Sequence, residues 1–347
     1  MATIKDVARL AGVGLGTASR VISGKGSVSP ATAARVRDAI EQLGFRPSHA
    51  ARSLPTGSTQ TIGVYIPVLT GTFYTPILNT IDAQLRTTGQ HMVVAFGSGA
   101  GNARAQALEG INFLIERGTD GVVAVTDSLL DRDIAALGAK AANLVVLNHY
   151  YKRIRPQCFA ADHETGGRLA ARALIEMGHR KVAIIGGPPE QADNVARLSG
   201  FRAEMVQHGV PESQLVALDG DYSAESGWRQ AQALLPRLSK YTALFCANDE
   251  MAVGALSRLH QAGISIPQEL SVLGYDDTQT AEYSAPKLTS VHIPWGAVTV
   301  NGLNFLRNRL YGTQLPVERQ FAASVTWRSS VARRVARRVA QQREGTT

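Results

Sequence analysis

TIKDVARLAGVGLGTASRVIS, residues 3–23, is the stretch that decides the fold of the N-terminal region. A Thr-x-x-Asp start signal opens a first short helix over residues 4–11, and Gly12 ends it. A second helix follows in the same stretch and closes near Ser23. The pattern therefore predicts two short helices joined by a tight turn.

The spacing of small and apolar residues in this stretch is typical of a helix-turn-helix. Such a motif needs a small residue where the helices touch, a turn residue able to adopt positive φ, and apolar positions that hold the second helix against the first. The residues that meet these needs are Val7, Ala8, Gly12, Val13, Ala18 and Val21. We therefore expect a DNA-binding unit.

The outward side chains of the second helix are the candidate DNA contacts. Arg20 can bond in a bidentate manner to guanine O6 and N7, while Thr17 and Ser19 suit phosphate oxygens. Leu15 and Gly16 stand where the helix start would meet base edges, and neither side chain can form hydrogen bonds. Readout there would be apolar, for instance Leu15 against a thymine methyl group. The alternative for Arg20 is a solvated surface charge.

A third helix and a linker complete the N-terminal part. Ser29 followed by Pro30 is a helix start signal, and Gly44 stops that helix, so residues 1–46 form a three-helix headpiece. Residues 47–60 contain prolines, glycine and hydroxyl residues around a short helical patch, and we expect a linker with one or two turns of helix.

The charge of the chain is concentrated at its two ends. The 347 residues carry a net charge of +8; residues 1–60 and residues 328–347 are each +5, which leaves residues 61–327 at −2. A basic N-terminal end indicates a polyanionic partner. With 18% charged and 44% hydrophobic residues the composition is globular, which excludes disorder for most of the chain.

The cysteines and the apolar segments of the chain indicate in which cellular compartment it acts. Cys158 and Cys246 are far apart with no C-x-x-C motif, so neither a disulfide framework nor a zinc site is indicated, and a reducing cytoplasm fits best. No signal-peptide h-region and no apolar stretch of membrane-spanning length is visible. We therefore expect a cytoplasmic protein without a membrane partner, metal or cofactor.

Residues 61–330 alternate short β-branched runs with helix-length amphipathic segments, which predicts parallel α/β sheets in two lobes of similar build. The expected strands include residues 62–68, 92–96, 121–125, 144–147, 182–185, 243–246 and 271–274. In such folds a small ligand binds at the carboxyl ends of the strands, in the crevice between the lobes.

Five segments carry a resemblance to a known family. They are IKDVARLAGV (4–13), TASRVI (17–22), GFRP (44–47), AARSL (50–54) and GYDD (274–277). They resemble the headpiece, hinge and body of the lactose and galactose repressor (LacI/GalR) family, and the resemblance continues to about residue 330. It implies a headpiece joined to a two-lobed body like that of periplasmic binding proteins, and a homodimer on a palindromic operator. It also implies that hinge residue Leu54, with Ala51 beside it, wedges into the central base step in the minor groove.

The resemblance also implies a set of effector-binding residues. Arg197, Asn248 and Asp276 match the arginine, amide and carboxylate of the effector pocket. The other matches are Phe73, Asn148, Tyr222 and Trp295. We expect a sugar or sugar derivative to weaken operator binding through lobe closure, in a repressor of carbohydrate-metabolism genes. A purine or another metabolite acting as corepressor remains the alternative. For Trp295 a core role is open, and Asp249 is expected to be an N-cap.

Catalysis is the competing function. Gly97 to Gly101 follows a strand but is not G-x-G-x-x-G, no G-x-S-x-G is present, and the carboxylates of Asp276 and Asp277 are too few for a hard cation. We expect no enzyme; a sugar-binding protein that acts alone is disfavoured by the basic headpiece. Residues 331–347 predict a basic amphipathic tail helix that either touches DNA or is a frayed solvated end, and its short valine stripe favours a dimer over larger assemblies.

Overall fold

The computed structural model describes residues 2–23, 26–45, 58–99 and 101–334. The chain divides into two compact units, residues 1–61 with 118–120, and residues 62–117 with 121–347. The hinge residues Ala51 and Leu54, and the tail beyond residue 334, lie outside the described residues.

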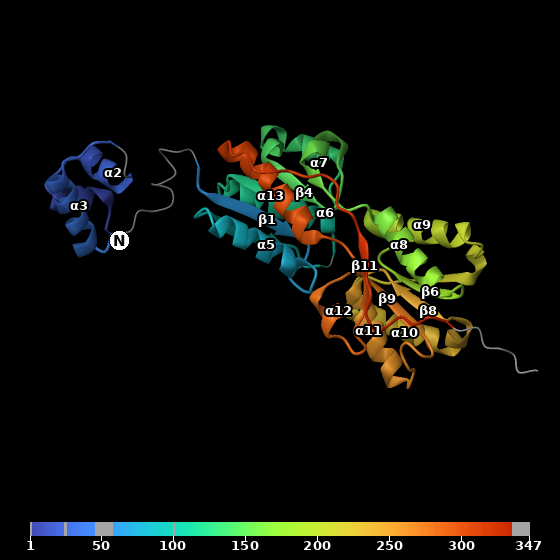
Figure 1. The fold of residues 1–347 in the computed structure, drawn as a ribbon. Coiled ribbons are helices and arrows are strands. Elements are labelled where there is room, and N and C mark those ends of the chain that lie inside the picture. Colours follow the sequence, from blue (N-terminus) through green and yellow to red (C-terminus); the bar gives the residue numbers. More distant parts are fainter. Residues whose placement is uncertain (1, 24–25, 46–57, 100, 335–347) are drawn as a thin grey trace, which may run out of the picture. The chain divides into compact units, whose positions relative to one another are not determined.

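The first unit contains three helices, α1 (Ile4–Leu10), α2 (Leu15–Ser23) and α3 (Pro30–Gln42) (Figure 1). The side chains of Thr3 and Asp6 form a reciprocal capping box at α1, and the turn to α2 passes through Gly12 at φ 62°. These are the start signal and the turn residue that the sequence predicts. The core of the three helices is made by Val7, Ala11, Val36 and Ala39, with Val13 and Val21 packed against it.

The second unit begins with a five-stranded sheet. Across it lie β2 (His91–Phe96), β1 (Thr61–Ile66), β3 (Gly121–Val125), β4 (Leu144–Leu147) and β5 (Cys158–Phe159). The pairs from β1 to β5 are parallel. The helices of this lobe are α5 (Tyr74–Arg86), α6 (Ala103–Glu116), α7 (Asp131–Ala136) and α13 (Trp295–Tyr311). Strands β3 and β4 are buried along their whole length, as expected for parallel strands covered on both faces.

The second lobe is a six-stranded sheet. Its order is β11 (Ser324–Thr326), β10 (Thr289–His292), β9 (Ser271–Asp276), β8 (Ala243–Cys246), β6 (Val182–Gly186) and β7 (Leu215–Asp219). Its helices are α8 (His163–Glu176), α9 (Ala192–Gln207), α10 (Ala224–Leu234), α11 (Asp249–Gln261) and α12 (Gln279–Tyr283). Short 3₁₀ turns occupy Gly138–Asn143, Lys152–Gln157, Glu212–Gln214 and Leu235–Lys240.

The chain passes between the lobes after β5, after β10 and after α13. Three segments distant in sequence therefore lie side by side where the two lobes join (Figure 1). The strands expected from sequence are present with ends shifted by at most two residues. The shifts of two residues are in β9, which continues to Asp276, and in β1, which ends at Ile66 because Pro67 has no N–H to continue the ladder.

Two features depart from the sequence interpretation. Strand β11 pairs antiparallel with β10, so the second sheet is not wholly parallel. The expected tail helix does not begin at residue 331: residues 331–334 are not helical, Val331 is buried in the core, and the Arg334 N–H donates to the Met177 carbonyl. This segment is therefore part of the second lobe.

Candidate functional site

Helix α2 exposes four of its five predicted DNA-contact residues. Ala18 is buried against the headpiece core, whereas Gly16, Ser19 and Arg20 are exposed and Leu15 is 48% exposed. Thr17 is half-buried. The Arg20 Nε donates to the Gly16 carbonyl at 3.2 Å, which is a weak contact that a base edge can replace.

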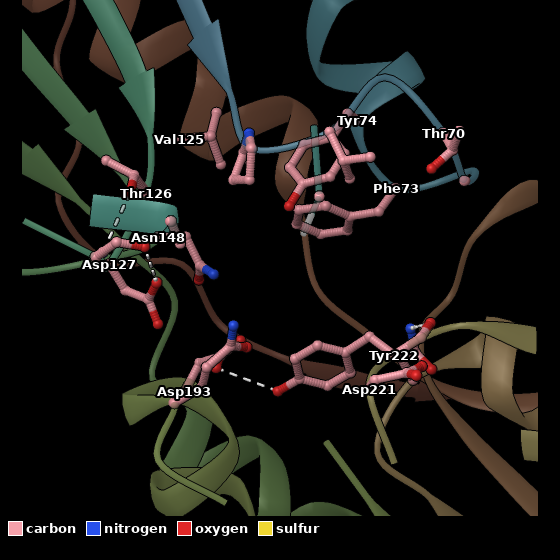
Figure 2. Close-up of a pocket in the computed structure, with 18 of the residues that line it drawn as sticks. Thr70, Phe73, Tyr74, Val125, Thr126, Asp127, Asn148, Asp193, Asp221 and Tyr222 are labelled. Carbon is pink, nitrogen blue, oxygen red and sulfur yellow. Dashed lines mark hydrogen bonds between the residues drawn. The ribbon is translucent and has the colours of Figure 1, made fainter. Parts of the chain in front are cut away.

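The second unit holds a cavity of about 480 Å³ between its two lobes, lined by residues just past the strands and at the starts of helices (Figure 2). All seven residues assigned to the effector by the sequence resemblance line it: Phe73, Asn148, Arg197, Tyr222, Asn248, Asp276 and Trp295. The volume is in the range of pockets for small molecules.

Three of these seven residues have left-handed backbone conformations. Asn148 has φ 68°, Tyr222 has φ 67° and Asp276 has φ 95°. Positive φ is uncommon for residues other than glycine, and Asn and Asp tolerate it best. Such conformations concentrate at binding sites, where the surrounding fold holds them.

Aromatic rings form one wall of the cavity. The ring of Phe73 lies edge-to-face on Trp295, with centroids 5.0 Å apart and an interplanar angle of 87°, and it makes a similar contact with Tyr74. Trp295 is largely buried yet lines the cavity, so the core role considered for it and a ligand contact are compatible. Rings in this arrangement offer flat apolar surface to the C–H faces of a ligand.

Arg197 projects from α9 and is 2% exposed. Its guanidinium stacks on the ring of Tyr275 at 3.8 Å, pairs with Asp193 at 3.6 Å and donates to the Ala247 carbonyl. The guanidinium is therefore partnered by an aromatic face, a carboxylate and a carbonyl oxygen, while its Nε has no hydrogen-bonding partner among the described residues.

Carboxyl groups outnumber cations in the cavity. Among the described lining residues five carry a carboxyl group and one, Arg197, carries a guanidinium; the acids are Asp127, Asp193, Asp221, Glu250 and Asp276. Burial raises the pKa of Asp276 to about 6, against the opposing effect of Arg197. Burial, and then repulsion from Asp193, raises the pKa of Asp127.

The carboxyl groups are held by specific donors. The indole Nε1 of Trp295 donates to Asp276 Oδ1 at 3.3 Å. The hydroxyl of Tyr222 donates to Asp193 Oδ1 at 3.1 Å (Figure 2). The hydroxyl of Thr72, from the first lobe, donates to Glu250 of α11 in the second lobe at 2.9 Å. This last contact joins the two lobes at the cavity.

The start of α11 differs from the sequence interpretation. The N-cap is Asn248, whose side chain accepts from the Met251 N–H and donates to the Tyr222 carbonyl at 2.9 Å. Asp249 is fully buried instead and accepts from the hydroxyl of Ser290 at 2.6 Å and from the N–H of Thr278 at 2.7 Å. The expectation that Asp249 caps the helix is therefore wrong, because its carboxyl group points into the core.

Sequence reasoning missed several lining residues. Thr126, Asp127 and Ser128 follow β3, so the rule that ligand contacts follow strands could have found them. Asp193 and Glu250 lie in the first turns of helices and carry no local signal that separates them from ordinary helix-start acids. The described residues contain no cluster of three or more His, Cys, Asp or Glu able to hold a metal ion. None of their helices is long and apolar enough to cross a membrane.

Two family patterns match the chain. The pattern of the bacterial regulatory proteins of the lacI family covers residues 3–48, and that of the periplasmic binding protein-like domain covers residues 171–331. The HTH-type transcriptional repressor PurR of Vibrio atlanticus is 32% identical over 89% of this chain and 92% of its own length. The regulator AscG of Escherichia coli is 32% identical over 85% of this chain and 88% of its own.

Solved structures agree with these relatives. A LacI-family regulator from Burkholderia phymatum is 44% identical, covers 79% of this chain and all of its own, and has a TM-score of 0.75. The lac repressor dimer bound to operator and an anti-inducer is 26% identical over 95% of this chain and 99% of its own, with a TM-score of 0.82. The regulator CelR in complex with cellobiose is 31% identical over 95% of this chain and all of its own, with a TM-score of 0.66.

Three observations indicate the same family: the helix-turn-helix headpiece, the two-lobed α/β body and the relatives that match nearly the whole chain. This protein belongs to the LacI family of DNA-binding transcriptional repressors, whose dimers bind operator DNA under the control of small-molecule effectors.

Proposed function

We propose that this chain is a repressor of carbohydrate-metabolism genes and that an uncharged sugar in the interlobe cavity releases it from a palindromic operator. The observation that carries the proposal is the polarity of the cavity: five carboxyl groups, one guanidinium that is already paired, and aromatic rings. Carboxylates accept hydrogen bonds from sugar hydroxyls, and rings pack on sugar C–H faces. A phosphate or carboxylate ligand would meet like charges.

The proposed residue roles follow the geometry. Leu15, Gly16, Thr17, Ser19 and Arg20 would contact DNA from α2, together with the hinge residues Ala51 and Leu54. The seven effector residues that line the cavity would bind the sugar. We propose the division of the chain that the sequence predicts: a headpiece over 1–46, a hinge over 47–60, the effector-binding and dimerisation body over 61–330 and a basic tail over 331–347, with the difference that residues 331–334 pack on the second lobe and belong to the body.

Two further points belong to the same proposal. The relatives are transcriptional regulators, which supports a chain that catalyses no reaction. A protein whose partner is operator DNA acts where the chromosome is, which supports a cytoplasmic location.

A corepressor that senses a purine is the second candidate, because PurR repressors are among the most similar relatives. The aromatic pair of Phe73 and Trp295 suits a flat base as well as a sugar. The two candidates differ in sign, since a corepressor strengthens operator binding and an inducer weakens it.

The test is a two-step ligand screen with the full-length dimer. Operators are first selected from random DNA. Thermal shift and operator affinity are then measured with D-ribose, D-glucose, D-galactose and cellobiose, with ribose 5-phosphate and glucose 6-phosphate, and with hypoxanthine and guanine. A neutral sugar that raises the melting temperature and lowers operator affinity supports the proposal. Binding of a sugar phosphate in preference to its parent sugar contradicts it, and a purine that tightens operator binding favours the corepressor.

A further inference from the structure

His163 lies behind the cavity between residues of the two lobes. It is the first residue of α8, where the chain passes from one lobe to the other, and it is 6% exposed. Its Nε2 is 2.8 Å from Oδ1 of Asn148, which lines the cavity from the first lobe. Its Nδ1 is 3.0 Å from the hydroxyl of Tyr275 in β9 of the second lobe.

The imidazole of His163 is neutral in this setting. Burial, and then the Arg197 guanidinium, holds the pKa of His163 well below its usual range. A neutral imidazole has one N–H donor and one bare nitrogen acceptor, so the two contacts have opposite directions. Either Nε2 donates to Oδ1 of Asn148 and Nδ1 accepts from Tyr275, or the Asn148 amide is turned over, so that its NH₂ group donates to Nε2 and Nδ1–H donates to Tyr275.

Tyr275 selects between these two arrangements. Its side chain is fully buried, and burial raises the pKa of its hydroxyl, which keeps its proton. The guanidinium of Arg197, which stacks on the ring at 3.8 Å from its centroid, offers only donors. Within the described chain His163 Nδ1 is the hydrogen-bonding partner of this hydroxyl. If Nδ1 carried the proton instead, the buried Tyr275 hydroxyl would lose its acceptor at a cost of about 1–3 kcal/mol.

The direction of the chain of contacts therefore runs from Tyr275 through His163 to Asn148. The Nε2–H of His163 donates to the side-chain oxygen Oδ1 of Asn148, and the side chain of Asn148 reaches into the cavity (Figure 2). An amide whose oxygen is engaged from behind offers its NH₂ group to the cavity. The orientation of Asn148 is thus set by a residue that does not itself line the cavity.

We propose that His163 is a positioning residue that holds Asn148 as a hydrogen-bond donor, so that the effector must present an acceptor oxygen to Asn148. The inference rests on the proposed sugar pocket and assigns a hydrogen-bonding role, that of a donor, to Asn148 within it. Asn148 differs in this respect from the carboxyl groups of the cavity, which accept hydrogen bonds from ligand hydroxyls. The carboxyl groups of the cavity would accept hydrogen bonds from the ligand, and Asn148 would donate one to it.

The packing around His163 keeps its ring in place for this task. Its ring centroid is 5.9 Å from that of Tyr275 and 6.0 Å from that of Trp295, with similar tilts. The ring is thus held between a cavity residue and its own hydrogen-bonding partner, and a flip of the imidazole would break both hydrogen bonds.

The first arm of the test needs no ligand. Full-length protein with ¹⁵N-labelled histidine is examined by NMR through the two-bond couplings of the imidazole nitrogens, and the His163 signals are assigned by their loss in His163→Gln. We expect a proton on Nε2, a bare Nδ1 and no titration between about pH 5 and 8. A proton on Nδ1, or titration in that range, overturns the proposal.

In the same arm, Asn148→Asp places a carboxylate beside Nε2. The pKa of His163 should then rise, and its signals should titrate in the accessible range because an opposite charge favours the protonated ring. An unchanged His163 in this variant would mean that the 2.8 Å contact is not formed in solution, and the proposal would fall.

The second arm measures function with the neutral sugar that gives the largest thermal shift in the screen above. His163→Leu removes both hydrogen bonds and should weaken sugar binding about tenfold or more. Asn148→Asp turns the donor into an acceptor and should lose about tenfold to a hundredfold. His163→Gln retains a donor and an acceptor and should stay within about threefold of the native protein.

Circular dichroism and the thermal midpoint verify that each variant is folded. Native affinity in a folded His163→Leu variant overturns the positioning role. Failure of every sugar to bind the native protein contradicts the proposed function alone, because the tautomer of His163 is decided by the first arm.

Discussion

Gly167 of α8 lies so close to Arg197 of α9 that a Cβ atom on Gly167 would stand 1.9 Å from the backbone oxygen of Arg197. The two helices can approach this closely only because Gly167 has no side chain. Gly200 on α9 makes the reciprocal contact with the backbone of Glu164. The position of the Arg197 guanidinium in the cavity therefore depends on the spacing of two helix backbones.

Gly167→Ala should move α9 and with it Arg197. We expect a loss of about 1–3 kcal/mol in the free energy of unfolding from overpacking, and weaker sugar binding in the protein that remains folded. Urea unfolding and calorimetric titration check this. Gly296→Ala is the matched control, because a Cβ there meets nothing within 4 Å and the residue is helical. Equal effects of the two variants would show that the close contact does not matter.

Stability should fall as pH rises from about 4 to 7. Burial raises the pKa of Asp249 to about 7 and that of Asp276 to about 6, from an ordinary value of 3.8. The unfolded chain releases these protons first, so the stabilising contribution is complete below about pH 4 and is lost as pH rises through 6 to 7, with a slope of up to about 1.4 kcal/mol per pH unit for each proton.

Urea unfolding of the full-length protein across this range, followed by tryptophan fluorescence, measures the slope; the three tryptophans lie at 228, 295 and 327. Asp249→Asn removes one titrating group and should flatten the profile. Parallel profiles for the variant and the native protein would exclude Asp249 as a source of the slope.

Arg20→Ala should cost about 1–3 kcal/mol of operator affinity and relax the preference at one base pair. The reason is that Arg20 is the exposed guanidinium on α2 and can read guanine. Fluorescence anisotropy on an operator library with single substitutions measures both effects. Arg86→Ala on α5, where the guanidinium pairs with Asp82 at 2.6 Å, is the control and should bind as the native protein does. Should Arg20→Ala weaken every sequence equally, Arg20 contacts phosphate only.

Gly12→Ala tests the turn between α1 and α2. Gly12 has φ 62°, and an added Cβ meets nothing within 4 Å, so the cost is backbone strain of about 1–2 kcal/mol. Gly14→Ala is matched, since a Cβ there is equally free but φ is not positive. Protection of the α2 amides from hydrogen exchange and operator affinity should both drop for the first variant alone. A like response of both would mean that the turn tolerates a side chain.

The headpiece was predictable from sequence because its signals are local. The capping box of α1, the positive φ of Gly12 and the N-cap at Ser29 are each determined within four residues of chain. Strands of four to six buried residues were also visible. Strand β5, with two residues, and strand β11, with three, are too short to show a pattern, and only their partners determine the pairing.

The residues that line the cavity were predictable only in part. Arg197, Asn248 and Asp276 stand in recognisable segments of the family and line the cavity. His163 gave no signal, because its two partners are 15 and 112 positions away and meet only when both lobes are folded. Asp249 was misjudged because an acid at a helix start usually caps it, whereas here the carboxyl group turns into the core toward Ser290.

The left-handed backbone at Asn148, Tyr222 and Asp276 restricts how new effector specificities can arise in this scaffold. Replacement of Asn148 or Asp276 by a bulky or β-branched residue would introduce conformational strain. That strain would offset the binding free energy that the new side chain gains from its contact with a ligand. Asp127, Asp193 and Glu250 have ordinary backbones and face the same cavity. Directed evolution toward a different inducer should therefore accumulate its substitutions at these permissive sites while the strained positions stay largely as they are.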